Sequence, residues 1–493
     1  MAEEEQKEEK EELITKIAKY IPAVEKPTYK PSFNSRLTWT GIALFLYLLL
    51  SYITVYGVSK TSYSKFSFYE IVLGSRFGSL MTLGIGPIVT AGILLQLLVG
   101  SKILNWDMSD AEMRNKFQTW NKFLAIILAF IEAIAYVVAG AVPVAGGLTT
   151  FILVILQLAA GGIVVILLDD LVSKWGFGSG ISLFIAAGVG SQILIRILSP
   201  LTLGCTPGNI LSCLPSMTNP PSGLFWDFIL SLLAGHIVPS LIYILPIIAT
   251  AIVFVIVVFV QDMRIDIPLV FSQMRGFGRT WSLKLLYTSN IPVILAAALI
   301  ANMQLLGRVG GVTNPNGVCS FFGCYDTNGN PISGAVYYLS SPGRQQFGLF
   351  GDIYSYFTGQ LSSPQMANEM LRALTYLSFL TIASTVFSVF WVNTSGMDSA
   401  SVAEQIEGIG MHIPGYRGDK KSMELVLNKY IPHLAVIGGF LIGIIASFAD
   451  FTGAIGTGTG ILLTVMIIYN YYEELSNQPL EEAHPMVKKI LGE

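Results

Sequence analysis

Long apolar runs alternate with short polar segments along most of the chain, and this pattern predicts membrane-spanning helices. A helix of about 20 apolar residues crosses about 30 Å of hydrocarbon, because each residue rises 1.5 Å. Ten segments have roughly this length: 38–58, 80–99, 120–140, 149–168, 180–199, 239–261, 287–306, 371–393, 431–449 and 455–471. We therefore expect an all-α polytopic membrane protein with ten transmembrane helices.

The second span is irregular, and a short apolar segment precedes it. The span carries Gly84, Gly86 and Pro87 near its start. The preceding stretch SKFSFYEIVLGSRFG, residues 64–78, is apolar on one side but too short to cross the bilayer. The pattern therefore predicts a half-helix followed by a broken span.

Composition and charge agree with a membrane protein and orient it. The chain has 493 residues, of which 12% are charged, whereas a soluble domain carries about 25%. Of the 29 Lys and Arg residues, 22 fall in the termini and in the loops on the side of the termini. By the positive-inside rule, both termini are cytosolic. Within the cytosolic segment 1–35, the stretch ELITKIAKYIPAV is expected to lie on the membrane surface as an amphipathic helix.

All four cysteines fall in two loops that this topology places outside the cell. Cys205 and Cys213 lie between spans five and six, and Cys319 and Cys324 lie between spans seven and eight. Because this side is oxidising, we expect the disulfides Cys205–Cys213 and Cys319–Cys324. A zinc site with four thiolates is the alternative, although neither pair has the C-x-x-C spacing of typical zinc sites.

A repeated motif divides the chain into two halves. DLVSKWGFGSGISL begins at Asp170 and DFTGAIGTGTGILL begins at Asp450, and both fit D-x5-G-x-G-[ST]-G-I-x-L without a gap. Two halves of five spans run in opposite directions through the membrane, because five is odd. The predicted parts are the first half 36–200, an external linker 201–238, the second half 239–471 and a cytosolic tail 472–493. The motif glycines allow close helix packing or a bend at the rim of a cavity.

The chain offers no enzyme signature but does place polar residues inside predicted spans. It contains no H-E-x-x-H, P-loop or G-x-S-x-G motif, and its four histidines are scattered. We therefore expect no catalytic residues, no cofactor and no metal. Thr90, Glu132 and Asn290 lie within or at the start of spans. A charged Glu132 costs at least about 2.5 kcal/mol in hydrocarbon, so it faces protein or water; holding helices together is its alternative role.

Three segments resemble a known family. TLGIGPIVTAGILLQLLVGS, YTSNIPVILAAAL and ADFTGAIGTGTGILLTV are similar to the matching segments of the SecY family, the protein-conducting channel subunit of the Sec translocon. The third segment is more similar to the archaeal and eukaryotic branch, and the resemblance runs from about residue 13 to 490. It implies a channel that passes unfolded secretory polypeptides and releases hydrophobic segments sideways into lipid, driven by a ribosome or another partner.

The resemblance also implies three sites in the membrane. Residues 64–78 would form a plug hinged at glycines, with Phe66, Phe68, Glu70, Ile71, Gly74 and Arg76 as its named residues. A hydrophobic pore ring would consist of Ile85, Val89, Ile181, Ile185, Ile294 and Leu463, which are all aliphatic. A lateral gate would open between spans two and three on one side and seven and eight on the other, with Thr90, Glu132 and Asn290 as its polar cluster.

Two cytosolic loops, 262–286 and 394–430, match the loops that dock the ribosome in this family. Their basic residues suit RNA phosphates: Arg264, Arg275, Arg279, Arg417, Lys420 and Lys421. Gln273, Glu404 and Gln405 depart from the basic residues of many relatives. The implied partners are a small SecE-type (gamma) subunit, a beta-type subunit, the ribosome, signal sequences, nascent polypeptides and membrane lipids. The implied location is the plasma membrane of a prokaryote, an archaeon by the branch it resembles.

Other functions fit parts of the pattern. A secondary transporter would share inverted repeats, broken spans and a buried Glu, but it would place a polar binding site in the middle of the membrane. An inactive subunit of the same family is a further alternative. The long external loop 307–370 has two interpretations, as a cap over the external funnel or as decoration specific to a lineage.

Overall fold

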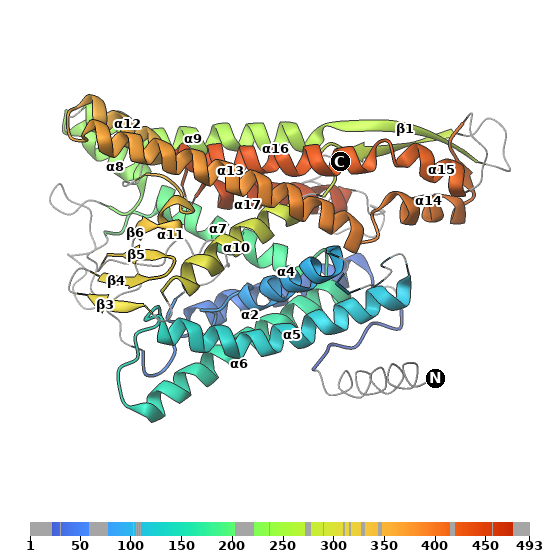
Figure 1. The fold of residues 1–493 in the computed structure, drawn as a ribbon, viewed down its shortest axis with the longest axis horizontal. Helices are drawn as coiled ribbons and strands as arrows, with labels where there is room; N and C mark the ends of the chain where they lie inside the picture. The colour runs from blue at the N-terminus through green and yellow to red at the C-terminus, as the bar shows by residue number, and fades with distance from the viewer. Residues whose placement is uncertain are drawn as a thin grey trace. The chain divides into compact units, whose positions relative to one another are not determined.

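The computed structural model describes residues 22–29, 31–58, 77–101, 103–104, 106, 108, 110–202, 221–235, 237–271, 278–288, 290–308, 311–314, 317–326, 331–343, 348–414, 420–455 and 457–476. These residues divide into two compact units. The first contains the described residues up to Phe184 together with those from Asn470 onward, and the second contains Ile185–Tyr469. Helices dominate both units (Figure 1), as the apolar pattern predicts. The predicted domain boundaries stay a prediction.

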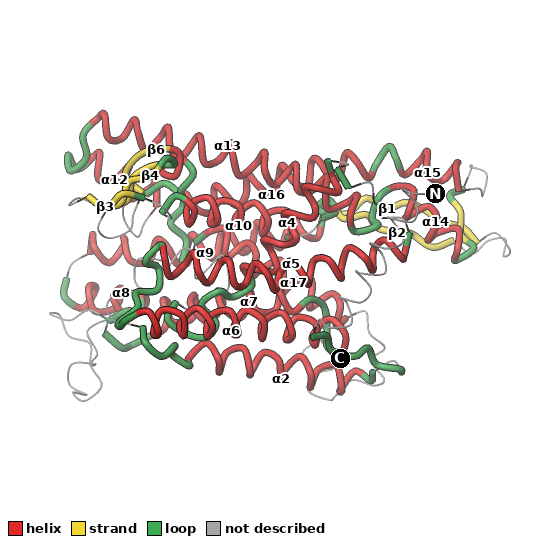
Figure 2. The backbone as a smooth tube through the Cα atoms, turned by 60° about the horizontal axis from the view of Figure 1, so that its bottom comes forward, coloured by secondary structure: helices red, strands yellow, loops and turns green. Residues whose placement is uncertain are grey.

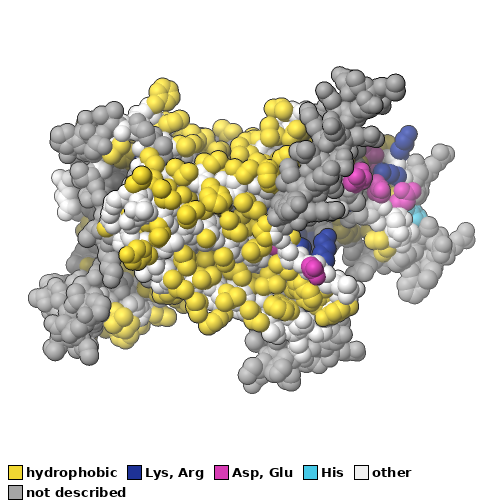
Figure 3. Space-filling view, turned by 90° about the horizontal axis from the view of Figure 1, so that it is seen from below, with side chains coloured by type: hydrophobic (Ala, Val, Ile, Leu, Met, Phe, Trp, Pro, Cys, Tyr) yellow, Lys and Arg dark blue, Asp and Glu magenta, His cyan; other side chains and the backbone are white. Residues whose placement is uncertain are grey.

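The first unit consists of four complete helices and the ends of two others. The complete helices are α2 (Phe33–Tyr52), α4 (Gly86–Gly100), α5 (Ala111–Val138) and α6 (Leu148–Trp175). The unit also contains the start of α7 (Gly180–Leu198) and the end of α17 (Gly458–Ser476). Helix α5 lies between α4 and α6, and α2 packs on α6. Exposed aliphatic side chains on α5 and α6 contribute to a broad hydrophobic area, visible on the face in Figure 3.

The second unit contains the remaining helices. They are α8 (Leu224–Leu233), α9 (Ile237–Asp262), α10 (Ile291–Leu306), α11 (Ala335–Tyr338), α12 (Gly348–Phe357), α13 (Ser363–Thr394), α14 (Ser399–Gly408), α15 (Lys420–Leu427) and α16 (Ile431–Phe451), with most of α7 and α17. Helices α13 and α16 lie side by side over most of their length (Figures 1 and 2). Proline in the first turn pre-sets the backbone at the start of α10, α13 and α16.

Two small sheets lie at opposite ends of the second unit's helices (Figure 2), and the all-α prediction did not include them. One has the order β2-β1-β7, with β1 (Arg264–Phe271), β2 (Gly278–Lys284) and β7 (Met411–His412). The other has the order β3-β4-β5-β6, with β3 (Val312–Asn314), β4 (Gly317–Ser320), β5 (Gly323–Tyr325) and β6 (Pro331–Gly334). Both sheets fall in loops between predicted spans, where hairpins satisfy the backbone outside hydrocarbon.

The lengths of the helices agree with a polytopic protein. Among the described residues, seven helices are long and apolar enough to cross a membrane, and three shorter apolar helices accompany them. One of the shorter ones is α4, which begins only at Gly86, so residues 80–85 of the predicted second span are not helical. The span is broken there, as Gly84 and Pro87 predict. The count of ten spans stays a prediction.

Small residues allow α13 and α16 to approach closely. A Cβ atom added to Gly443 would lie 2.6 Å from the Cα atom of Thr381, and one added to Gly439 would lie 2.7 Å from the Cβ atom of Ser388. These two glycines are four residues apart and therefore share one face of α16. Membrane helices lack a hydrophobic driving force between them, so such close contacts supply much of their association energy.

We predict that Gly443→Ala destabilises the protein, while Gly41→Ala does not. The added methyl at 443 meets the backbone of α13, and overpacking of this kind costs about 1–3 kcal/mol. Gly41 lies in α2 with nothing within 4 Å of its added Cβ atom, so alanine there improves helix propensity by about 0.5–1 kcal/mol. The unfolding midpoints of both variants in detergent check this. Equal midpoints would contradict the close approach of α13 and α16.

Candidate functional site

The glycine motifs lie at two helix junctions, one in each unit. In the first unit, a carboxylate in the last two turns of α6 binds the start of α7, because the Ile181 amide donates to Asp169 Oδ1 at 2.9 Å. Gly180 touches the same residue, since an added Cβ atom would lie 2.6 Å from the Cα atom of Asp169. The carboxylate therefore satisfies a backbone amide that the first turn of a helix leaves unpaired.

The second unit repeats this arrangement at the junction of α16 and α17. The Thr459 amide donates to Asp450 Oδ1 at 3.1 Å, and the Thr459 hydroxyl donates to Asp450 Oδ2. An added Cβ atom at Gly458 would lie 1.9 Å from the carbonyl carbon of Ala449. Gly180 and Gly458 thus allow the close packing that was one of the two interpretations of the motif.

The capping aspartate in the first unit is not the one that the repeat aligns. The motif pairs Asp170 with Asp450, but Asp169 binds the start of α7. Helix α6 continues to Trp175, whereas α16 ends at Phe451, one residue after its aspartate. Because α6 continues beyond Asp170, the side chain of Asp170 points away from the start of α7. The neighbouring Asp169 accepts the amide at the start of α7 instead.

A threonine from another helix completes each junction. The Phe177 amide donates to Thr40 Oγ1 of α2 at 3.0 Å, and the Ile455 amide donates to Thr250 Oγ1 of α9 at 3.1 Å. Both hydroxyls donate in turn to the carbonyl four residues earlier in their own helix. Helices α2 and α9 correspond to spans one and six, the first span of each predicted half. This shared contact supports the repeat in a way that the sequence did not show.

The first-unit junction has further contacts around its turn. Arg36 Nε donates to the Gly176 carbonyl at 3.0 Å, and the Arg36 guanidinium lies 4.3 Å from the centre of the Phe177 ring. The Tyr471 hydroxyl of α17 lies 3.0 Å from the Ser179 carbonyl. Arg36 also pairs with Glu474 of α17 at 3.2 Å. The turn before α7 is therefore fixed by α2 and by the end of α17.

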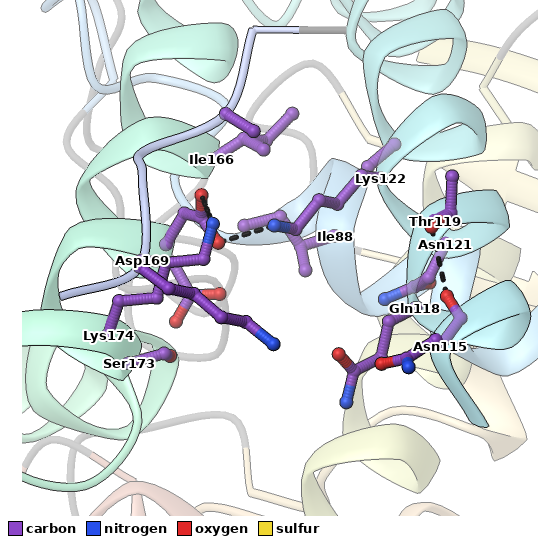
Figure 4. A pocket seen from close by; sticks show the side chains of 14 residues that line it. Ile88, Asn115, Gln118, Thr119, Asn121, Lys122, Ile166, Asp169, Ser173 and Lys174 are labelled. Atoms are coloured by element: carbon purple, nitrogen blue, oxygen red, sulfur yellow. Dashed lines mark hydrogen bonds and ion pairs between the residues drawn. The ribbon is translucent and has the colours of Figure 1, made fainter. Parts of the chain in front are cut away.

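Asp170 faces a polar cavity of about 700 Å³ within the first unit. It forms ion pairs with Lys122 of α5 and with Lys174, and it accepts the Val24 amide at 2.8 Å. Figure 4 shows Lys122 reaching across from α5 toward the end of α6, with the amides of α5 lining the opposite wall. Asp170 therefore joins the segment before α2 and helix α5 to α6.

The two units share the six residues predicted for the pore ring. Ile85, Val89 and Ile181 belong to the first unit, and Ile185, Ile294 and Leu463 belong to the second. They lie at or near the starts of α4, α7, α10 and α17, which are the helices that the junctions and first-turn prolines place. All are buried except Ile181, which is partly exposed. Their meeting in one ring stays a prediction.

The structure brings together two of the three residues predicted for the gate. The Thr90 hydroxyl of α4 donates to Glu132 Oε1 of α5 at 2.8 Å, and Glu132 is buried. Asn290 belongs to the second unit, where it is buried just before α10. The Thr90–Glu132 contact joins the predicted second and third spans, so Glu132 also holds helices together.

Several predicted residues lie outside the described residues. Residues 64–76 of the predicted plug are among them, with Phe66, Phe68, Glu70, Ile71, Gly74 and Arg76, and so are Cys205, Cys213, Arg275 and Arg417. A disulfide joins Cys319 to Cys324, which are direct partners on β4 and β5. This hairpin belongs to the loop 307–370, whose described part forms the four-stranded sheet with α11 and α12.

The described basic residues lie around the β2-β1-β7 sheet. Arg264 opens β1 and pairs with Asp262 at 3.0 Å, and Arg279 lies in β2. Lys420 pairs with Glu404 at 2.6 Å, and Lys421 is exposed beside it on α15. The hydrogen bond to Glu404 raises the pKa of the Lys420 ammonium above its usual value. Part of the positive charge predicted for this surface is therefore offset within the chain.

Sequence reasoning missed the residues that hold the junctions. Asp169, Thr40 and Thr250 were not predicted, although all lie in apolar spans or directly beside them. An acidic residue at the end of an apolar span, followed by a glycine-rich turn, is a usable signal. The two threonines give no such signal, because a hydroxyl within a helix often bonds only to its own backbone.

Archaeal proteins of one kind are similar to this chain along nearly its whole length. The SecY family pattern matches residues 79–472. The protein translocase subunit SecY of Pyrococcus furiosus is 41% identical over 98% of this chain and 99% of its own. That of Methanocaldococcus jannaschii is 41% identical over 97% of this chain and 98% of its own.

Solved structures share the fold. One described as the structure of a protein conducting channel has a TM-score of 0.77 and 41% identity, covering 96% of this chain and 99% of its own. One of Sec61 in the canine ribosome-channel complex from the endoplasmic reticulum has a TM-score of 0.74 and 39% identity, with the same two coverages. A third, with a TM-score of 0.75, 41% identity and again the same coverages, concerns the plug domain of a SecY protein.

The apolar helices and their matching junctions define a multi-pass α-helical membrane protein. Within that class, the chain belongs to the SecY family. This assignment confirms the resemblance found in the sequence, and with it the prediction of a channel subunit that is not an enzyme.

We predict that Thr90 and Glu132 are energetically coupled. Removing the Thr90 hydroxyl by Thr90→Val leaves the buried Glu132 carboxyl without this donor, and a buried polar group that loses its hydrogen-bond partner costs about 1–3 kcal/mol. The loss should shrink to a few tenths of a kcal/mol when Glu132 is already alanine. Unfolding in detergent of the two single variants and the double variant measures the coupling. Additive losses would show that the contact contributes nothing.

Proposed function

We propose that the chain is the central subunit of a protein translocation channel, passing unfolded secretory polypeptides across the membrane and releasing hydrophobic segments into lipid. The observation that carries this proposal is the near full-length match to a solved protein-conducting channel, at a TM-score of 0.77 over 96% of the chain. The pore is passive, and the energy for threading comes from a ribosome or another partner.

The six aliphatic ring residues supply the seal. An apolar constriction sheds water and so blocks ions while the channel is closed. The same side chains offer a moving polypeptide no hydrogen bonds, so the polypeptide slides past them. A secondary transporter would need polar groups at this place, and family membership favours the channel.

The lateral gate acts through partitioning. It lies between α4 and α5 on one side and α10 and α13 on the other, with Thr90, Glu132 and Asn290 as its polar cluster. Each leucine or phenylalanine at the centre of a candidate segment favours lipid by about 0.3–0.6 kcal/mol, and each charge opposes it by about 2.5–3.5 kcal/mol. A segment exposed to lipid at the gate is therefore sorted by its own sequence.

Residues 64–78 serve as the plug of the closed channel. In one solved relative, a SecY protein, the plug domain is described as stabilising the closed state of the translocation channel and maintaining a membrane seal. In this chain Gly78, the last residue of the segment, and Leu80 hydrogen-bond to Val55 and Ile53, just after the end of α2. That anchorage would let the plug leave while the start of the second span stays in place.

The proposed partners follow from the same relatives. The canine Sec61 structure was determined in a ribosome-channel complex, and the loops around the β2-β1-β7 sheet would dock a ribosome here. A SecE-type subunit and a beta-type subunit complete the proposed complex. Both termini face the cytosol of an archaeal cell, and the protein lies in the plasma membrane.

We predict that a translocating polypeptide contacts the ring. A single cysteine is placed at Leu463 after the four native cysteines are removed, and a ribosome-stalled secretory chain with one cysteine is added to membranes containing the partner subunits. A disulfide to residue 463 is expected. The control is a cysteine at Val255, which is 64% exposed on α9 and faces away from the unit. Stalled chains that bind without linking to residue 463 would contradict the channel.

We also predict that Glu404→Gln strengthens ribosome binding. The substitution releases Lys420 from its ion pair, so one more cation is available to phosphate. The slope of log affinity against log salt should steepen by about one. The control Glu407→Gln removes the same charge from α14, but Glu407 acts on Lys420 only through a smaller Coulombic attraction, whereas Glu404 accepts its hydrogen bond. Equal effects of the two variants would point to net charge alone.

A further inference from the structure

A buried carboxylate joins three helices of the second unit. Asp450 is the second-last residue of α16 and is 5% exposed. It accepts the Tyr376 hydroxyl of α13 at 2.7 Å, and it accepts both the amide and the hydroxyl of Thr459 at the start of α17. Tyr376 and Thr459 are each 1% exposed. The three residues, named here the Asp450 cluster, therefore connect α13 to α17 through one carboxylate.

The Asp450 cluster is stiff for two reasons. Hydrogen bonds away from water are costly to leave unmade, because no solvent replaces a lost partner. In addition, Gly458 lies so close to the backbone of Ala449 that an added Cβ atom would not fit between them, so α17 has no room to move toward α16 at this point. A movement of α13 at the level of Tyr376 is therefore passed to the first turn of α17.

The first turn of α17 leads directly to the pore ring. Leu463 follows Thr459 by four residues, which is about one helical turn and the same face of the helix. Helix α13, at the other end of the connection, is one of the proposed gate helices. The Asp450 cluster thus stands between the gate and one side chain of the ring.

The first unit has a weaker version of the same connection. There Lys122 pairs with Asp170 of α6. Lys122 belongs to α5, the proposed gate helix that corresponds to α13 in the first half. That pair borders the polar cavity (Figure 4), and its Lys122 side chain is 29% exposed, whereas Tyr376 and Thr459 are buried. Asp170 is as buried as Asp450, so the two contacts differ in the exposed lysine, which water can solvate when the ion pair opens. We therefore expect the contacts of the Asp450 cluster, and not the Lys122–Asp170 pair, to stay formed when the helices move.

We propose that the Asp450 cluster couples the lateral gate to the pore ring, so that movement of α13 and displacement of Leu463 occur as one step. This inference rests on the proposed function. Asp450, Tyr376 and Thr459 are positioning residues, since none of them touches the polypeptide.

The test measures how strongly ring opening depends on a signal sequence. Leu463→Cys is linked to stalled chains that carry either a functional signal sequence or one with a charge in its apolar core, and the ratio of the two yields is taken. In the otherwise unchanged channel the ratio is high. Thr459→Val and Tyr376→Phe are each expected to lower it roughly two- to tenfold, as the loss of one hydrogen bond implies.

Thr464→Val is the matched control. Thr464 is another buried threonine of α17, but its hydroxyl donates to the Gly460 carbonyl within the same helix. This variant should leave the ratio unchanged. Unfolding midpoints in detergent show whether any variant is merely less stable, because general destabilisation would lower both yields and not their ratio.

The double variant gives the sharpest outcome. If the Asp450 cluster acts as one connection, Thr459→Val combined with Tyr376→Phe lowers the ratio no further than the stronger single variant does. Independent, multiplying effects would overturn the proposal, as would a ratio equal to that of Thr464→Val. Failure of the unchanged channel to link at residue 463 would instead contradict the proposed function itself.

Discussion

The structure depends on satisfying backbone groups where helices begin inside a membrane protein. The first amides of a helix have no partner within it, and hydrocarbon offers none. At the starts of α7 and α17, an aspartate from the preceding helix meets this need. A threonine of α2 or α9 accepts an amide from the turn just before each of these helices. At α4 and α10 a proline in the first turn removes one amide instead.

This constraint also explains the composition of the helix interfaces. A carboxylate reaches the next helix only if the two backbones come close, which requires Gly180 and Gly458 at the junctions. Gly439 and Gly443 play the same part between α16 and α13. Because α13 is thereby held against α16, Tyr376 comes within hydrogen-bond distance of Asp450. The glycines therefore bring the helices close enough for the buried polar side chains to form hydrogen bonds between them.

Much of this fold could be predicted from the sequence, but few of the hydrogen bonds that hold the site could be. Apolar length predicted the helices, and the glycine motif predicted that two junctions would be alike. The motif misplaced the first capping residue by one position, because helix length and not sequence alignment decides which side chain faces the turn. The strands β1–β7 were not predicted either, because their short segments lie in polar loops where the apolar period is weak. Thr40 and Thr250 could not be found at all, since their role exists only after the helices pack.

The two halves share a contact between their third and fourth helices, but they make it with different side chains. In each half, the third helix contacts an aspartate at the end of the fourth, through Lys122 in one and Tyr376 in the other. Water beside Lys122 can replace a lost partner at small cost, whereas Tyr376 has no such substitute. The contact made by the partly exposed lysine is therefore easier to break than the buried contact made by Tyr376, so the third and fourth helices are held together more firmly in the second half than in the first.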